Sequence, residues 1–167
     1  MTKRAGDAFD TILGPLVRRG YLLAVTMLED REDAEDAVQE ASIKAWRNLG
    51  DLRDTGKLEP WFLAIVANEC RSIRRRRRSE DQLEAVQDSD RFDEDRAVAA
   101  LDLDRALARL HSEDRAALYL HYYEDLTFEQ AAQVTGEHMT AVRSRIYRAL
   151  DRLRPGLTQQ EDEHANG

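Results

Sequence analysis

Cationic and small polar side chains gather on one face of a predicted helix near the C-terminus, within residues 126–153, LTFEQAAQVTGEHMTAVRSRIYRALDRL. Apolar residues recur there at helical spacing, as Val142, Ile146, Leu150 and Leu153. The opposite face can enter a DNA major groove, because small side chains allow close approach and guanidinium groups bind bases or phosphates. We therefore expect DNA contacts from six residues on or beside that face: Thr140, Ala141, Arg143, Ser144, Arg145 and Arg148.

A helix-turn-helix motif would position this helix. Thr127 and Gln130 have the spacing of a capping box, in which two side chains satisfy free amides at a helix start. Ala131 and Ala132 permit a close second helix, and Gly136 supplies the left-handed backbone of a tight turn. The alternative is a solvent-exposed helix in an ordinary helical hairpin. The cap, the small residues, the glycine and the basic face together favour DNA binding.

Charge is segregated along the chain, whose formal net charge of −8 is unlike that of a simple basic DNA-binding domain. Residues 71–78 hold six arginines and no acid, whereas residues 80–104 hold ten acids and two arginines. A chain with this distribution can bind a polyanion locally while repelling it overall. We expect weak DNA binding by the free chain and assistance from a partner.

Composition favours an all-α fold. The 167 residues include 8 Gly and 3 Pro, and no run of alternating β-branched residues predicts a sheet. The longest apolar stretches, Tyr21–Leu28 and Trp61–Ala67, are too short to span a bilayer, and MTKRAGDAFD lacks the apolar core of a signal peptide. The single cysteine, Cys70, cannot form an internal disulfide, so we expect a cytoplasmic protein.

Sequence patterns of catalysis are missing. The four histidines have no metal-ligand spacing, and neither a phosphate-binding glycine loop nor a Gly-x-Ser-x-Gly motif occurs. We therefore predict a protein that is not an enzyme, with no catalytic residue, metal or cofactor.

Two small helical domains are expected, at residues 8–78 and 96–154, joined by a flexible acidic linker at 79–95 and followed by a disordered tail at 155–167. The low apolar content of the linker is typical of an unfolded segment. In the first domain we predict helices at Ala8–Met27, Arg31–Leu49 and Pro60–Arg76, with a polar loop at Asp51–Glu59.

Local signals refine this organisation. Gly14-Pro15 and Gly20 are candidate kinks in the first helix, whose core side would include Ile12. In the second domain, a helix is expected over 96–110, and Ser112 is a candidate cap for the helix that follows.

Three motifs in one order resemble a known family. They are DAEDAVQEASIKAWRNL at 33–49, EPWFLAIVANECRSIRRRRR at 59–78, and the helix-turn-helix. Together they resemble an extracytoplasmic-function sigma factor of bacterial RNA polymerase. The resemblance implies that the first domain is sigma region 2, which docks on polymerase and captures the melted −10 element. It implies that the second is region 4, which reads the −35 element.

The resemblance assigns polymerase docking to one face of the helix at 31–49. That face meets the clamp coiled coil of the largest polymerase subunits in the family. On the residues alone, a solvent-facing side of an amphipathic helix explains the same pattern. The residues that match the docking face are Asp36, Gln39, Glu40 and Ile43.

Capture of unpaired −10 bases requires stacking surfaces, polar groups and cations. The loop Asp51–Glu59 occupies the matching position, together with Trp61, Asn68, Arg71, Arg74, Arg75 and Arg76. Trp61 is equally a candidate core residue. The arginine run also resembles a nuclear-localisation signal, but contact with the DNA backbone fits a bacterial protein. About four phosphate contacts would give a log–log salt slope near −4.

Region 4 departs from the common family pattern at two places. Thr140-Ala141 stand where Gly-Thr is common, and Asp125 stands where Gly is common. The first departure removes one hydroxyl from the reading face, and the second alters the turn before the motif. A promoter sequence therefore cannot be copied from relatives.

The partners that the resemblance implies are polymerase core and promoter DNA, with a chain that is a monomer when free and does not insert into membranes. The sequence leaves open whether an anti-sigma factor binds it. The alternative function is a stand-alone helix-turn-helix regulator, which would bind duplex DNA without polymerase, commonly as a dimer. Neither dimerisation heptads nor a ligand-pocket signature supports that alternative.

Overall fold

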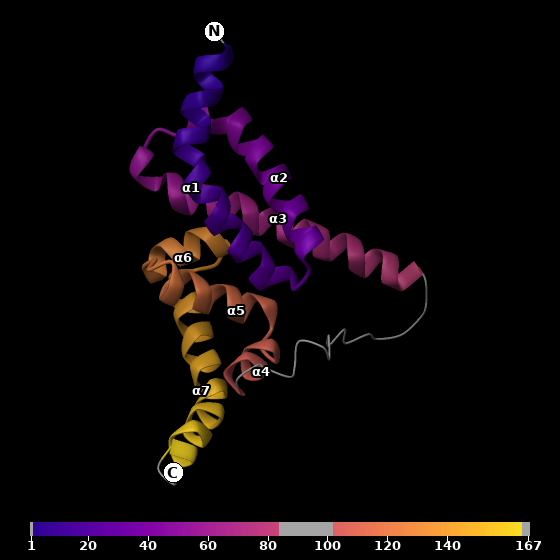
Figure 1. Cartoon of the computed structure of the whole chain (residues 1–167), viewed down its shortest axis with the longest axis vertical. Coiled ribbons are helices and arrows are strands. Elements are labelled where there is room, and N and C mark those ends of the chain that lie inside the picture. The colour runs from indigo at the N-terminus through magenta and orange to yellow at the C-terminus, as the bar shows by residue number, and fades with distance from the viewer. Residues whose placement is uncertain (1, 84–101, 165–167) are drawn as a thin grey trace.

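The computed structural model describes the backbone of residues 2–83 and 102–164, and the side chains of residues 10–81 and 105–154. Within these ranges every regular element is helical, which confirms the all-α prediction. Figure 1 shows two groups of helices that lie against each other, with α1 and α3 beside α5 and α6.

The N-terminal half is a bundle of three long helices, α1 (Thr2–Leu28), α2 (Arg31–Asn48) and α3 (Leu58–Leu83). Each of the three packs against the other two. Gly20 of α1 lets α3 approach closely, because a Cβ at that position would lie 3.0 Å from Phe62 and 3.0 Å from Val66. Helical spacing predicts a buried stripe on α2 with Trp46 alongside it: Ala34, Val38, Ala41, Ala45 and Leu49. The first four are buried, Leu49 is half-buried, and Ala37 is buried beside them.

Two short 3₁₀ turns connect α2 to α3, namely η1 (Leu49–Asp51) and η2 (Thr55–Lys57). Asp54 caps the second turn by accepting a hydrogen bond from the Gly56 amide at 3.0 Å. The predicted polar loop is therefore ordered by its own backbone and side chains. Helix α3 then begins at Leu58, two residues before Pro60, where the sequence predicted its start.

The C-terminal half contains α4 (Asp102–Ala108), α5 (Ser112–Leu118), the π-helical turn η4 (Tyr119–Tyr123), α6 (Phe128–Thr135) and α7 (Met139–His164). After η4 the backbone of Asp125 is left-handed, with φ 54°. Glycine adopts this conformation most easily, and aspartate tolerates it better than most residues. The turn before the motif is therefore made by an aspartate in a backbone conformation that glycine adopts most easily.

The helix-turn-helix prediction is confirmed in its local chemistry. The Thr127 amide donates to Gln130 Oε1 at 2.9 Å, and the Gln130 amide donates to Thr127 Oγ1 at 3.1 Å, which closes the capping box. Gly136 ends α6 in the left-handed region, with φ 71°. On the inner side of α7, Val142, Ile146, Ala149 and Leu153 are buried and Leu150 is half-buried.

Several boundaries differ from the predictions. The first helix runs without a break through Pro15. The third helix continues to Leu83, so residues 79–83 are helix rather than linker, because glutamate, glutamine and leucine are good helix formers. The last helix passes Pro155 and continues to His164, because glutamine and glutamate in that segment are also good helix formers. Residues 155–164 are therefore not an unstructured tail.

Three smaller predictions were also wrong. Ile12 is 47% exposed rather than in the core, because helical spacing alone does not fix which positions a neighbouring helix covers. His111, not Ser112, holds the cap position of α5, and no side chain caps that helix. The remainder of the predicted linker, together with residues 96–101, lies outside the described residues.

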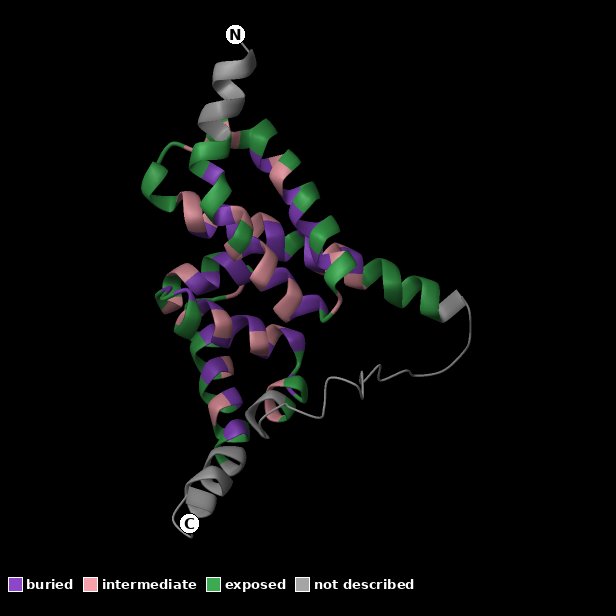
Figure 2. Cartoon of the chain, viewed as in Figure 1, coloured by how far each residue is buried: buried purple, intermediate pink, exposed green. Residues whose placement is uncertain are grey.

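The two halves share one continuous apolar core. Buried residues from both belong to a single cluster, which includes Val66 and Cys70 of α3 and Ala131 and Val134 of α6. Figure 2 shows buried positions following one another from the three-helix bundle into α5, α6 and α7. The chain therefore folds with its two predicted domains packed together.

Candidate polymerase and nucleic-acid interfaces

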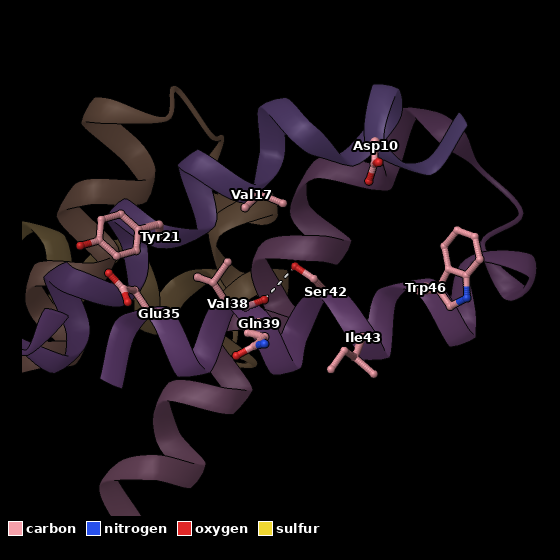
Figure 3. A pocket seen from close by; sticks show the side chains of 9 residues that line it. All are labelled: Asp10, Val17, Tyr21, Glu35, Val38, Gln39, Ser42, Ile43 and Trp46. Carbon is pink, nitrogen blue, oxygen red and sulfur yellow. Dashed lines mark hydrogen bonds between the residues drawn. The ribbon is translucent and has the colours of Figure 1, made fainter. Parts of the chain in front are cut away.

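An apolar groove of about 770 Å³ runs between α1 and α2. Figure 3 shows Val17 of α1 above Val38 of α2, with Trp46 at one end of the groove and Tyr21 and Glu35 at the other. Trp46 is 45% exposed, so it lines this surface rather than filling the core beside it. A groove of this chemistry accepts apolar side chains from a partner.

The four predicted docking residues are all exposed, as their position off the buried stripe predicted: Asp36, Gln39, Glu40 and Ile43. Gln39 and Ile43 also line the groove. The acidic and apolar side chains of α2 thus form one continuous outer surface.

A second cavity, of about 560 Å³, lies between the α2–α3 connection and the start of α3. Trp61 lines it and is also half-buried against the core, so its core interpretation holds in part, while its role in base capture stays a prediction. Arg53 and Lys57 bring cations to its edge, and Asp51 and Asp54 bring carboxylates. An aromatic ring with hydrogen-bonding groups and cations around it has the chemistry needed to hold an unpaired base.

The other predicted −10 residues separate into two groups. Asn68, Arg71 and Arg74 line one side of α3 and form a hydrogen-bonded network with the C-terminal half. Arg75 and Arg76 are exposed. None of these five residues lines the cavity beside Trp61, so the structure does not bring the six −10 residues together at one place.

The outer face of α7 carries five of the six predicted −35 residues as exposed side chains: Thr140, Ala141, Arg143, Ser144 and Arg148. The Arg143 guanidinium carbon lies 5.7 Å from the centre of the Tyr147 ring and 5.9 Å from that of Phe128. Such cation–π contacts hold a guanidinium in place without neutralising it.

Arg145 differs from its neighbours. Its Nη1 lies 2.8 Å from Asp114 Oδ1, and its Nε and Nη2 lie 3.2 and 2.5 Å from the Glu137 carboxylate. Hydrogen bonding to Glu137 is the largest of the effects that raise the pKa of Arg145. The guanidinium ties α7 to α5 and to the turn, and its donors are directed into the protein.

Sequence reasoning missed Tyr147, which is 49% exposed beside Arg143 on the outer face of α7. An exposed aromatic ring between two arginines of a recognition helix offers an apolar surface for a thymine methyl group or a deoxyribose. The residue's place between Ile146 and Arg148 could have revealed it, because it falls off the apolar stripe.

The described residues offer neither a metal site nor a membrane-spanning helix. In residues 2–83 and 102–164, no three His, Cys, Asp or Glu side chains gather in a way that would hold a metal ion. Every helix in those same ranges is too short or too polar to cross a bilayer. Cys70 is buried, and this burial raises the pKa of its thiol to about 12, so it has no nucleophilic character at neutral pH.

Comparison with known families decides the identity. Residues 13–80 match the family described as Sigma-70 region 2, and residues 100–153 match Sigma-70, region 4. The chain belongs to the extracytoplasmic-function sigma factors. It is 33% identical over 154 residues to the ECF RNA polymerase sigma factor SigM of Mycobacterium tuberculosis, covering 89% of this chain and 78% of that protein.

Other relatives agree. The RNA polymerase sigma-H factor of Pseudomonas aeruginosa is 30% identical over 166 residues, covering 90% of this sigma factor and 86% of the relative. The sigma factor RpoE of Bartonella quintana, solved in complex with the anti-sigma factor NepR, has the same fold. Its TM-score is 0.75 at 24% identity, over 90% of this chain and 97% of that one. The N-terminal half is therefore region 2, the C-terminal half is region 4, and the chain functions with RNA polymerase at promoters.

Proposed function

We propose that three separate surfaces carry the steps of initiation in this sigma factor. The α1–α2 groove and the exposed face of α2 dock on polymerase core, the cavity beside Trp61 holds an unpaired −10 base, and the outer face of α7 reads the −35 element. The observation that supports this most directly is the exposure of every predicted docking residue beside an apolar groove. As a factor that acts through polymerase, the protein needs no catalytic group of its own, and its place is the cytoplasm.

Docking would combine charge with apolar contact. Asp36 and Glu40 offer carboxylates, and Ile43 offers a 40% exposed side chain at the edge of the groove. Charged rim residues accelerate association, whereas a buried apolar centre contributes most of the affinity. The triple variant Asp36→Ala, Gln39→Ala, Glu40→Ala should bind core polymerase more weakly, and its free energy of unfolding should stay within about 0.5 kcal/mol of the parent's.

On α7, Arg143 and Arg148 are our candidates for base or phosphate contact, with Tyr147 beside them. Arg145 is proposed as a positioning residue, because its guanidinium already bonds Asp114 and Glu137. A bidentate contact from arginine to guanine is worth about 1–3 kcal/mol of discrimination. Transcription from a promoter library with a randomised −35 element, using core polymerase and each variant, tests the assignment.

The experiment also separates this function from that of a stand-alone regulator. A sigma factor gives specific initiation only when core polymerase is present, whereas a regulator gives tight, specific gel shifts alone. Tight duplex binding by the free chain at physiological salt would reject the sigma role proposed for these surfaces.

We also propose an anti-sigma factor as a regulatory partner. The similar Bartonella quintana structure holds a sigma factor bound to one, and CnrH, with a TM-score of 0.64, was solved with the cytosolic domain of CnrY. The α1–α2 groove is an apolar surface that such a partner can cover. Co-purification of the tagged chain from its native cells, compared with the variant Ile43→Asp, tests this proposal.

A further inference from the structure

One row of basic and polar side chains on α3 faces region 4 of the same chain. Asn68, Arg71 and Arg74 are three residues apart, so they lie on one side of the helix. Arg71 Nη2 donates to the carbonyl oxygen of Thr135 at 2.8 Å, and Nη1 donates to Asn68 Oδ1 at 3.1 Å. The row is therefore engaged by the turn of the helix-turn-helix.

Glu113 of α5 completes this contact. Its carboxylate lies 3.4 Å from both Nε and Nη2 of Arg71 and 3.3 Å from Nη1 of Arg74. Guanidinium groups bind a carboxylate and a phosphate through the same planar arrangement of donors. The Thr135 carbonyl adds partial negative charge, because it lies at the C-terminal end of α6. Region 4 thus presents to α3 the kind of charge that a DNA backbone would present.

An ion pair and a backbone hydrogen bond extend the contact between the halves. Arg19 of α1 pairs with Glu124, whose side chain is 2% exposed, and Tyr119 donates to that same carboxylate at 2.6 Å. Arg115 of α5 donates to the Thr26 carbonyl at 3.1 Å. These contacts surround an apolar core that both halves share. The arrangement is a built interface rather than a single surface salt bridge.

Burial shows that the interface partly covers the two arginines of the row. The side chains of Arg71 and Arg74 are 22% and 28% exposed, whereas Arg75 and Arg76, one and two positions further on, are exposed. In the arginine run, residues 75–78 are therefore the ones exposed to solvent beyond the interface.

From these contacts we infer that the free sigma factor holds itself closed, with Glu113 of region 4 occupying the α3 guanidinium groups in place of DNA phosphate. The inference rests on the role as −10 DNA contacts that the family resemblance implies for Arg71 and Arg74, which we propose for this chain as well. DNA can reach this row only after region 4 moves away from α3. A closed population of about 90% would weaken apparent DNA binding about tenfold, because only the open fraction binds.

The test uses the full-length chain and the substitution Glu113→Arg, which places a cation against Arg71 and Arg74. Small-angle X-ray scattering measures the radius of gyration, and fluorescence anisotropy measures affinity for a labelled single-stranded oligonucleotide. The parent chain should scatter as the closed structure does. The variant should expand and bind the oligonucleotide about tenfold more tightly.

Glu32→Arg is the matched control. Glu113 and Glu32 each follow the first residue of their helix, and the control changes net charge equally. Glu32 is exposed on region 2, so its substitution should leave the radius of gyration unchanged and alter oligonucleotide affinity only by the general effect of charge. Glu113→Gln, which keeps the shape of the side chain, should give a smaller expansion and replaces Glu113→Arg if circular dichroism shows that variant to be unfolded.

Two results would overturn the inference in different ways. If the parent chain already scatters as separated halves, or if both Glu113 variants stay compact, the closed state does not depend on this contact. If the variants expand but bind the oligonucleotide no more tightly than the Glu32→Arg control, the halves do open, and the failure lies in the proposed DNA contact of Arg71 and Arg74.

Discussion

Arg145 of the recognition helix and Asp114 of α5 are joined at 2.8 Å, between Nη1 and Oδ1, across 31 positions of sequence. Asp114 is itself buried, with its side chain 12% exposed. The same guanidinium bonds Glu137 in the turn. One side chain therefore sets the angle at which α7 leaves the body of region 4.

Replacing Arg145 with alanine should lower the free energy of unfolding by about 1–2 kcal/mol, because two carboxylates lose their cation in a partly buried place. Arg143→Ala should change stability by no more than about 0.5 kcal/mol, since that guanidinium is exposed. Chemical denaturation of the two variants measures the difference.

Arg143 and Arg145 should also differ in their effects at the promoter, because one is proposed to contact the DNA and the other to hold α7 in position. Arg143→Ala should change which bases are preferred in a randomised −35 library, whereas Arg145→Ala should weaken initiation on all members alike. If Arg145→Ala instead changed the base preference at one position and left stability intact, Arg145 would be a DNA-reading residue and not a positioning residue.

The lowered pKa of Asp30 predicts that the stability of the folded state depends on pH. Asp30 caps α2 by accepting a hydrogen bond from the Asp33 amide at 2.9 Å, which is the main reason that its pKa lies below the ordinary 3.8, and Arg77 lowers the pKa further. A carboxylate with a lowered pKa stabilises the folded state above 3.8, and this contribution is lost as pH falls through the folded-state pKa.

Asp30→Asn isolates this contribution, because asparagine caps a helix as well as aspartate does. The parent should be more stable than the variant at neutral pH, and the difference should narrow as pH falls below about 4. Denaturant titrations across this range test the sign. A difference that grows on acidification would contradict it.

Gly136 and Gly14 should respond differently to alanine. Apart from its chain neighbours, an added Cβ meets nothing within 4 Å at either position, but only Gly136 has a positive φ, of 71°. Gly136→Ala should therefore cost about 1 kcal/mol of stability from backbone strain alone. Gly14→Ala, inside α1 and directly before Pro15, should change stability by less than about 0.5 kcal/mol, because the gain in helix propensity is opposed by crowding between the new Cβ and the proline ring. Thermal unfolding of both variants is sufficient to compare them.

Local chemistry explains which parts of the fold were predictable. The capping box, the glycine turn and the small-residue stripe of α2 involve partners within a few positions of one another, so spacing alone revealed them. The exposure of the four proposed docking residues could also be predicted, because they lie off the buried stripe.

Contacts between distant segments were not predictable in the same way. Arg71 meets Glu113 across 42 positions, and no periodicity in either helix indicates that pairing. For the same reason Trp46 was predicted to lie beside the core and Ile12 to lie in it, although both are exposed. Helical spacing cannot show which apolar positions a neighbouring segment covers. The roles of the arginines depend on these long-range contacts.

The two tryptophans should affect different steps of initiation. Trp61 lines the cavity beside the α2–α3 connection, and Trp46 lines the α1–α2 groove. Stacking of a base on an aromatic ring is worth about 1–3 kcal/mol, so Trp61→Ala should reduce open-complex formation by roughly tenfold or more while core binding is retained.

Trp46→Ala is the matched change on the other surface. It should weaken assembly with core polymerase, and saturating core should restore open-complex formation, because the −10 cavity is intact. Anisotropy of labelled sigma titrated with core measures assembly, and permanganate footprinting of unpaired thymines measures opening. Since both substitutions remove an indole that is partly exposed, a general loss of stability would lower both signals for both variants. Distinct losses on the two assays require two distinct surfaces, and identical losses would reject the separation of docking from base capture.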